Sequence, residues 1–307
     1  MSKFFKKLII FVIPIIIILS IFEYNLSRIP TSYNLKKNFL DKNASSIQIL
    51  ALGSSHALSG VNPEFFSMKG FNAADSSQSL YYDYQIYKKY ADDLKNLKVV
   101  IVPISYFSLE YNFSRNTEAW RENFYKKIYG FGLETKKSNI DIRGFSYMAL
   151  YGQLRSIFYA SKLFKVNLAA NINENGWYKQ EGKEAVWEFA QKRAQYHESI
   201  MDPMSLDNNV NYLKKMIESI KIKGADVMLI TVPVTTDYSN NVNLEKYNLM
   251  QDTIRKITEE YDIKYFNYFS DKRFVSDDFY SSDHLNAAGA EKFSKILDID
   301  IKNANKI

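Results

Sequence analysis

Cysteine is absent from the 307-residue chain. This absence excludes disulfide bonds, thiolate zinc sites and cysteine nucleophiles. Histidine is also scarce, with three residues in the whole sequence: His56, His197 and His284. Two of these, His56 and His284, lie in short polar segments near opposite ends of the chain.

An excess of positive charge is absent from most of the chain, although the formal net charge is +6. Residues 1–42 contain seven basic and two acidic residues, so they account for most of that charge. The remaining residues are close to neutral, whereas a nucleic-acid-binding domain needs a basic surface. We therefore expect no nucleic-acid partner and assign the charge to a segment that flanks a membrane.

A long apolar run, Leu8–Phe22, carries no charge and follows Lys3, Lys6 and Lys7. Together with neighbouring aromatic residues it approaches the ~30 Å thickness of a bilayer's hydrocarbon core. No small-x-small cleavage site follows it, so we expect an uncleaved, single-pass anchor in the cell membrane. The lysines place the amino end in the cytoplasm. We predict a cytoplasmic tip and transmembrane anchor over residues 1–24, a juxtamembrane linker over 25–44 and an extracytoplasmic domain over 45–307.

Apolar runs typical of buried strands alternate with helical patterns from residue 45 onward. The runs lie at 47–52, 99–102 and 227–234, a further short strand is expected near 263–268, and helical spacing occurs at 80–94, 207–224, 247–261 and 287–297. This alternation predicts a parallel, doubly wound α/β sheet. Between about residues 106 and 203 the rhythm stops, and no β-branched run of strand length occurs there. We expect a mostly helical insertion over the carboxyl edge of the sheet.

Two short segments carry most of the chemical information. Gly53-Ser54-Ser55-His56 follows the first predicted strand, and Asp283-His284-Leu285-Asn286 precedes the last predicted helix. Taken alone, each is typical of a turn or of a capped helix start. In a parallel α/β sheet, however, functional groups gather beyond the carboxyl ends of the strands. Because a serine beside an imidazole is the minimum apparatus for acyl transfer, the joint pattern favours chemistry over capping.

With these segments assembled, the chain resembles the SGNH (GDSL-like) hydrolase superfamily over roughly residues 45–300. The resemblance rests on Leu52–His56, on Phe71-Asn72 with Ser76–Leu80, and on His284–Ala290. More narrowly, the chain is similar to the membrane-anchored branch that includes the alginate O-acetylation proteins and the DltD proteins of teichoic acid D-alanylation. The resemblance implies a flavodoxin-like three-layer α/β/α sandwich, with Ser55 as the nucleophile and His284 as the base. We expect no cofactor and no metal.

The sequence departs from the family pattern at three places. Ser54 stands where the first motif usually has aspartate, and Ser281 stands where the late Asp-x-x-His motif has its aspartate. A carboxylate that orients His284 must then be Asp283, our candidate, or Asp278 or Asp277. The oxyanion-hole glycine and asparagine of the family have no clear counterparts. The oxyanion candidates are the backbone amides at Ser55 and near Ala74, with Ser54 and Asn72 beside them.

The resemblance implies a membrane-tethered O-acyltransferase, with acetyl as the expected group, that modifies a secreted or cell-wall polysaccharide. Because acyl-CoA is absent outside the membrane, it also implies a multi-pass membrane acyltransferase as the acyl donor. The lipid bilayer would hold both proteins and raise their effective concentration. A carbohydrate acetyl esterase of the same fold and a non-catalytic glycan-binding or assembly component are the alternatives.

The lysines before the apolar run generate a prediction about topology. Protease added to intact cells should degrade the chain beyond about residue 30 and leave the first few residues protected, as the distribution of positive charge requires. Immunoblots with tags at either end would measure this. Recovery of the whole protein from the culture medium, cut after the apolar run, would contradict the predicted anchor.

Overall fold

The computed structural model describes residues 2–132, 134, 142–152, 155, 166–182 and 189–305. The chain divides into two compact units. The smaller unit contains Met1–Leu35 and Trp120–Ala170, and the larger contains Lys36–Ala119 and Asn171–Ile307. All the predicted strands and both chemical segments fall in the larger unit, which therefore holds the candidate site.

The smaller unit is built around the N-terminal helix α1 (Ser2–Ser27). Its segment Lys3–Ser27 is long and apolar enough to cross a membrane, a property that membrane anchors and signal sequences share. Near its end, the carboxylate of Glu23 accepts hydrogen bonds from the backbone N–H groups of Tyr147 (2.7 Å) and Met148 (3.1 Å) in α6 (Tyr147–Tyr151). Glu23 thus satisfies donors that the start of a helix leaves without partners.

A five-stranded parallel sheet forms the middle of the larger unit. Its strands are β1 (Ile49–Ala51), β2 (Gly70–Asn72), β3 (Val99–Pro103), β4 (Asp226–Thr231) and β5 (Lys264–Asn267). They lie in the order β2-β1-β3-β4-β5, and every neighbouring pair is parallel. This is the strand order of flavodoxin-like doubly wound folds, so the predicted fold class is confirmed.

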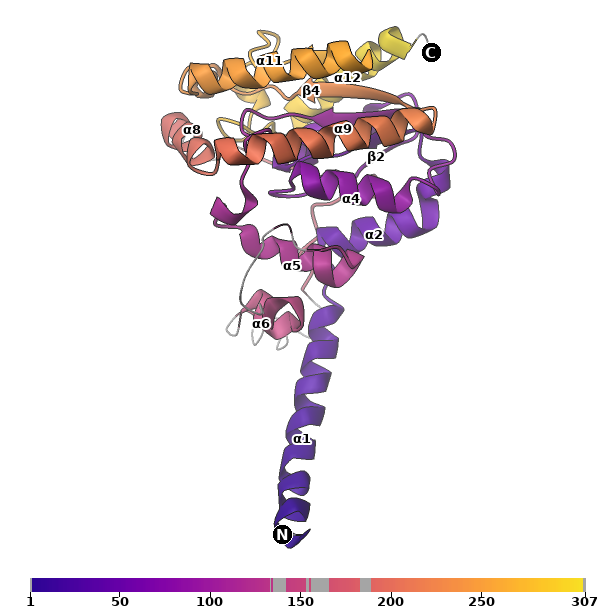
Figure 1. Ribbon diagram of the computed structural model, residues 1–307, viewed down its shortest axis with the longest axis vertical. Helices are drawn as coiled ribbons and strands as arrows, with labels where there is room; N and C mark the ends of the chain where they lie inside the picture. Colours follow the sequence, from indigo (N-terminus) through magenta and orange to yellow (C-terminus); the bar gives the residue numbers. More distant parts are fainter. Residues whose placement is uncertain are drawn as a thin grey trace. The chain divides into compact units, whose positions relative to one another are not determined.

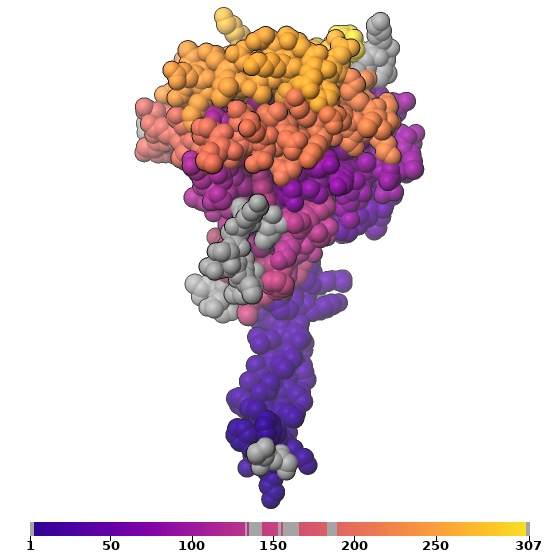
Figure 2. Space-filling model, viewed as in Figure 1, coloured from indigo at the N-terminus to yellow at the C-terminus, as the bar shows by residue number. Residues whose placement is uncertain are grey.

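Helices cover both faces of the sheet, which gives three layers. On one face α4 (Leu80–Tyr90) packs against α9 (Leu206–Ile222), and on the other α3 (Ser55–Gly60) packs against α12 (Ala287–Asn305). Figure 1 shows α9 and α4 on one side of β4 and α11 (Leu244–Tyr261) and α12 on the other. In the space-filling view the residues of α9 and α11, in orange tones, lie at the surface (Figure 2). The central strands are therefore buried on both faces, as their continuous apolar runs predict.

The remaining helical segments are short, apart from α2 and α8. They are α2 (Ser32–Asn43), α5 (Glu122–Phe124), α8 (Ala190–Ser199), α10 (Thr236–Ser239), a π-helical turn η5 (Tyr125–Tyr129), and the 3₁₀ turns η1 (Ala44–Ser46), η2 (Pro63–Phe65), η3 (Phe113–Arg115), η4 (Ala119–Arg121), η6 (Ile142–Gly144), η8 (Pro203–Ser205) and η9 (Ser276–Asp278). Most of the segment predicted to be a linker, 25–44, is therefore helical.

The predicted insertion, 106–203, is divided between the two units. Its described part contains short helical segments and two isolated bridges, Tyr111 with Met201 and Ile172 with Tyr178, but no strand. Residues 133, 135–141, 153–154, 156–165 and 183–188 of this segment lie outside the described residues. Helix α8, which returns to the larger unit, supplies two side chains to the candidate site.

Candidate active site

The turn after β1 places Ser55 at the start of a helix. Gly53 has φ of +111°, and a Cβ atom there would lie 3.1 Å from the ring of Pro103, so the turn favours glycine. The N–H of Gly53 donates a 2.8 Å hydrogen bond to Oδ1 of Asp83 in α4. Ser55 then begins α3 and is half-buried. A buried carboxylate on the neighbouring helix thus fixes the turn that presents the predicted nucleophile.

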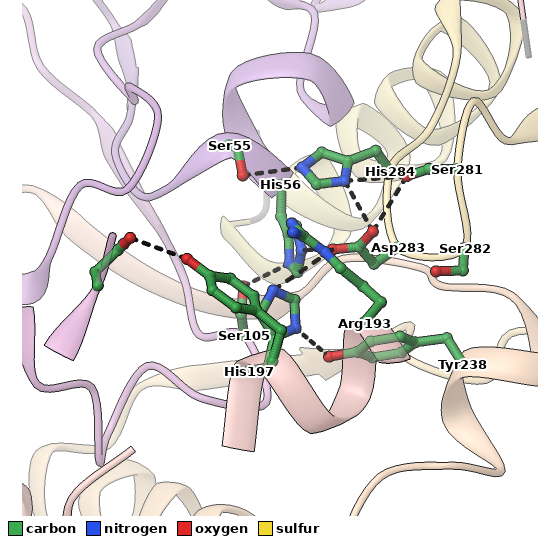
Figure 3. Close-up of polar contacts among 12 residues, drawn as sticks. Ser55, His56, Ser105, Arg193, His197, Tyr238, Ser281, Ser282, Asp283 and His284 are labelled. Carbon is green, nitrogen blue, oxygen red and sulfur yellow. Dashed lines mark hydrogen bonds and ion pairs between the residues drawn. The ribbon is translucent and has the colours of Figure 1, made fainter. Parts of the chain in front are cut away.

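The structure brings Ser55 and His284 together across 229 residues of sequence. Nε2 of His284 lies 2.9 Å from Oγ of Ser55. Figure 3 shows the imidazole between the serine hydroxyl on one side and Ser281 and Asp283 on the other. This distance is within hydrogen-bonding range, so the imidazole can take the hydroxyl proton as the oxygen attacks.

Asp283 supplies the carboxylate behind His284, although it is the direct sequence neighbour of that histidine. Its Oδ1 lies 3.0 Å from Nδ1 of His284. The hydroxyl of Ser281 donates to the same Oδ1 at 3.1 Å and lies 3.3 Å from Nδ1 of His284. Asp278 instead accepts from the N–H of Val275 and from Lys292, both at 2.8 Å. Asp277 is exposed. Of the three carboxylates proposed from the sequence, Asp283 is the one that meets the base.

Three further side chains, none predicted from the sequence as a site residue, gather on the second oxygen of Asp283. Oδ2 lies 3.0 Å from Nε2 of His56, 2.8 Å from Nε of Arg193 and 3.7 Å from Nε2 of His197 (Figure 3). Arg193 and His197 come from α8. Every histidine of the chain therefore belongs to this site. The small number of histidines in the chain could have indicated that His197 belongs to the site, but no local sequence motif identifies His197 or Arg193 as a site residue.

Burial and charge determine which of these groups are ionised. Burial by itself would raise the pKa of Asp283, but its electrostatic interactions with His284 and Arg193 and the hydrogen bonds from His284 and His56 hold the pKa of that carboxyl well below its usual range. Burial lowers the pKa of His56, and burial together with the charge of Arg193 lowers the pKa of His197 strongly. The site at neutral pH therefore combines an ionised carboxylate with two neutral histidines.

Two of the predicted oxyanion donors are used elsewhere, which corrects that part of the sequence prediction. The side-chain amide of Asn72 donates to the carbonyls of Ala57 (2.8 Å) and Val61 (2.7 Å), and its oxygen accepts from the N–H of Ala74 (3.0 Å). Asn72 thus holds α3 against β2, and neither Asn72 nor Ala74 has an N–H left for an oxyanion. Within the described residues, the backbone N–H of Ser55 makes no hydrogen bond, so it is available to an oxyanion.

Ser54 lines a small pocket beside the nucleophile turn. The pocket has a volume of about 10 Å³ and is also lined by Gly53, Gln78, Pro103 and Phe107. This volume corresponds to about one water molecule or methyl group. Ser54 is 7% exposed, and its hydroxyl makes no capping hydrogen bond to α3. The pocket lies beside the turn that presents Ser55, and neither Ser55 nor His284 lines it.

The cluster also has the composition of a metal site. Ligand atoms of His56, Asp283 and His284 lie within 4.8 Å of one another. However, Oδ2 of Asp283 already contacts the guanidinium of Arg193, and a metal cation beside that permanent charge would be repelled. The two ring contacts to Asp283 are at hydrogen-bond length, so the residues fit a hydrogen-bonded network better than a metal centre.

The known proteins to which this chain is similar are distant. Neither a family model nor a curated protein matches the sequence. Similar solved structures include a “putative acylhydrolase” from Bacteroides fragilis, with 10% identity and a TM-score of 0.41 over 88% of this chain and 95% of that chain. They also include a GDSL-like lipase from Bacteroides thetaiotaomicron, with 11% identity and a TM-score of 0.41 over 89% of this chain and 98% of that chain. At this low identity the comparisons do not assign a reaction to the chain, so the chemistry of the site is derived from its own side chains.

The carboxyl that fixes the nucleophile turn generates a prediction about stability and pH. Burial raises the pKa of Asp83 to about 7, although N–H groups of Gln78 and Gly53 favour its charged form. Between about pH 4 and pH 7 the folded protein then holds a proton that the unfolded chain releases, so its free energy of unfolding falls as pH rises. Asp83→Asn keeps an acceptor oxygen for the N–H of Gly53 but removes the titrating group. The free energy of unfolding, measured by urea unfolding, should therefore depend less on pH between about pH 4 and pH 7 in this variant.

Asp207→Asn, at an exposed position, is the matched control for the removal of one carboxyl group from the chain. An Asp83→Asn protein as sensitive to pH as the wild type over the same interval would show that Asp83 does not titrate in that range.

Proposed function

We propose that this protein is a membrane-tethered, extracytoplasmic serine O-acyltransferase that uses Ser55, His284 and Asp283. The observation that carries the proposal is the continuous contact from Oγ of Ser55 to Nε2 of His284 (2.9 Å) and from Nδ1 of His284 to Oδ1 of Asp283 (3.0 Å). These three groups, in this order, are the constellation that serine acyl transfer requires.

The proposed reaction has two balanced steps. Oγ of Ser55 attacks the acyl carbonyl while Nε2 of His284 takes its proton, and the collapsing tetrahedral intermediate expels a leaving group that receives this proton. An acceptor hydroxyl then attacks the Ser55 ester, giving its proton to His284, which returns it to Oγ of Ser55 as that bond breaks. Asp283 stabilises the imidazolium that forms in each step and stays ionised throughout.

The N-terminal helix supports acyl transfer near a membrane, and acetyl is the acyl group that we propose. Helix α1 is apolar enough to span a bilayer and carries three lysines near its amino end. A tether of this kind favours a second membrane protein as acyl donor, here a multi-pass acyltransferase, because both are confined to one surface. The proposed acceptor is a hydroxyl of a secreted or cell-wall polysaccharide.

A carbohydrate acetyl esterase is the second candidate, because the same acyl-enzyme is hydrolysed if water reaches it. Ser55 and His284 are both half-buried rather than enclosed, so water has access. The third hypothesis, a non-catalytic glycan-binding or assembly component, is based on the serine at position 281 and on the lack of the family's oxyanion-hole residues. The contact of Asp283 with His284 provides a carboxylate in place of the missing aspartate, which answers the first of these two arguments.

The proposed nucleophile can be tested with an activated acetyl ester. The full-length protein in detergent, mixed with p-nitrophenyl acetate and quenched in acid, should gain one acetyl group on the peptide that carries Ser54 and Ser55. Ser55→Ala should abolish the adduct, because Ser55 carries the hydroxyl that contacts Nε2 of His284, the nitrogen that takes the proton. Ser54→Ala is the matched control and should retain it. Loss of the adduct in Ser54→Ala alone, or its absence in the wild type, would contradict the proposal.

The fate of the acetyl group on Ser55 distinguishes the acyltransferase from the esterase. After acetylation of Ser55, decay of the adduct in buffer measures hydrolysis, and its acceleration by added polysaccharide, with acetyl appearing on the polymer, measures transfer. Decay at one rate with and without every polysaccharide tested would favour the esterase.

A further inference from the structure

The dipeptide Ser55–His56 contacts the dipeptide Asp283–His284 twice. Ser55 meets His284, and His56 meets Asp283 (Figure 3). The second contact has no part in the proton transfer described above. It joins Nε2 of His56 to Oδ2 of Asp283, the carboxylate oxygen that faces away from the base. His56 is 4% exposed and Asp283 is 1% exposed, so solvent cannot replace this bond.

The neighbours of His56 determine its tautomer. A carboxylate only accepts hydrogen bonds, so Nε2 of His56 must carry the proton that is shared with Asp283. In the neutral ring Nδ1 is then an acceptor, and it lies 2.8 Å from Oγ of Ser105, which donates. The N–H of Ser105 in turn fixes Oγ of Ser108 at 2.9 Å. Ser105 follows β3, so the end of a central strand holds the ring of His56 in place.

We propose that His56 is a positioning residue that fixes Asp283 through Oδ2 and thereby orients the proposed base His284. This inference rests on the proposed function. Asp283 contacts His284 through Oδ1 alone, so this contact by itself does not prevent the carboxylate from rotating. Rotation of the carboxylate would remove that contact and cost the imidazole its orientation.

Other groups face Asp283, but they are less suited to this task. They are Arg193 and His197 from α8, Tyr238 from α10 and Ser281 from the loop before α12. The side chain of Arg193 is 35% exposed and brings a permanent charge that competes with the imidazolium of His284 for the carboxylate. His197 lies 3.7 Å away, and its Nδ1 contacts the hydroxyl of Tyr238 at 2.5 Å. His56 is both buried and neutral, so it fixes the oxygen without adding a competing charge.

The inference is tested by two substitutions of the same side chain. His56→Phe keeps the ring but removes the donor, whereas His56→Gln keeps an N–H that can reach Oδ2. With p-nitrophenyl acetate and full-length protein, His56→Phe should lower kcat by about 10²-fold with little change in KM, because orientation of the base affects the transition state. His56→Gln should recover most of this loss.

The pH profile distinguishes positioning from packing. Without the hydrogen bond from His56, the carboxylate of Asp283 interacts more strongly with the imidazolium of His284. The acid limb of kcat/KM should therefore move to higher pH in His56→Phe, and by a smaller amount in His56→Gln. Equal losses in both variants with an unmoved acid limb would show that His56 only packs, and would overturn the inference. An active, folded His56→Phe protein with wild-type kcat would do the same.

A measurement independent of activity separates this inference from the proposed function. In the Ser55→Ala protein, ¹⁵N NMR of the three histidines, assigned by single substitutions, should show His56 as the neutral Nε2–H tautomer at neutral pH. A charged or Nδ1–H His56 would overturn the inference even if Ser55 is the nucleophile. Conversely, wild-type protein that forms no acyl-enzyme, but has this tautomer, would reject the proposed function and leave the contact between His56 and Asp283 standing. In that case the inferred positioning role would also be rejected.

Discussion

The buried carboxylate of Asp283 organises the candidate site. An isolated charge at a position that is 1% exposed would be very costly. Here each oxygen receives hydrogen-bond donors: Oδ1 meets His284 and Ser281, and Oδ2 meets His56 and Arg193. The carboxylate therefore stays charged, and its charge in turn fixes the donors around it. These hydrogen bonds stabilise the buried charge of Asp283. They also orient the imidazole of His284, which contacts Ser55.

The doubly wound fold explains why these residues come together from distant parts of the sequence. Ser55 and His56 follow β1, Ser105 follows β3, and Asp283 and His284 precede the helix that packs beside α3. All of them lie at the carboxyl edge of the parallel strands, where such folds place their ligands. The contribution of α8 is different, because Arg193 and His197 reach this edge from the segment inserted after β3. The insertion thus completes the site.

Much of the fold follows from patterns that are visible in the sequence. The apolar runs at β1, β3 and β4 are long enough to indicate buried strands. The edge strand β5 has exposed and half-buried residues, and β2 has three residues, one of them glycine, and gives no such signal. For the site, Ser55 and His284 stand in motifs, and Asp283 was identified as a neighbour of the base.

The residues that could not be predicted depend on tertiary contacts. Arg193 and His197 lie in a segment without strand periodicity, and nothing in its local sequence shows that α8 approaches the sheet. Asn72 was proposed as an oxyanion candidate from the family resemblance of the segment Phe71-Asn72. Its side-chain amide instead donates hydrogen bonds to two carbonyl groups at the end of α3. This role can be recognised only when the position of α3 beside β2 is known.

The central claim is that Asp283 orients His284 for acyl transfer by Ser55. The most direct measurement is the pre-steady-state rate at which p-nitrophenol is released as the acyl-enzyme forms, compared between Asp283→Asn and the neighbouring carboxylate variant Asp278→Asn. Because an amide leaves the imidazole in the wrong tautomer, the rate in Asp283→Asn should fall by about 10⁴-fold, while folded Asp278→Asn should react at close to the wild-type rate. A wild-type rate in Asp283→Asn, or an equal loss in both variants, would contradict the account.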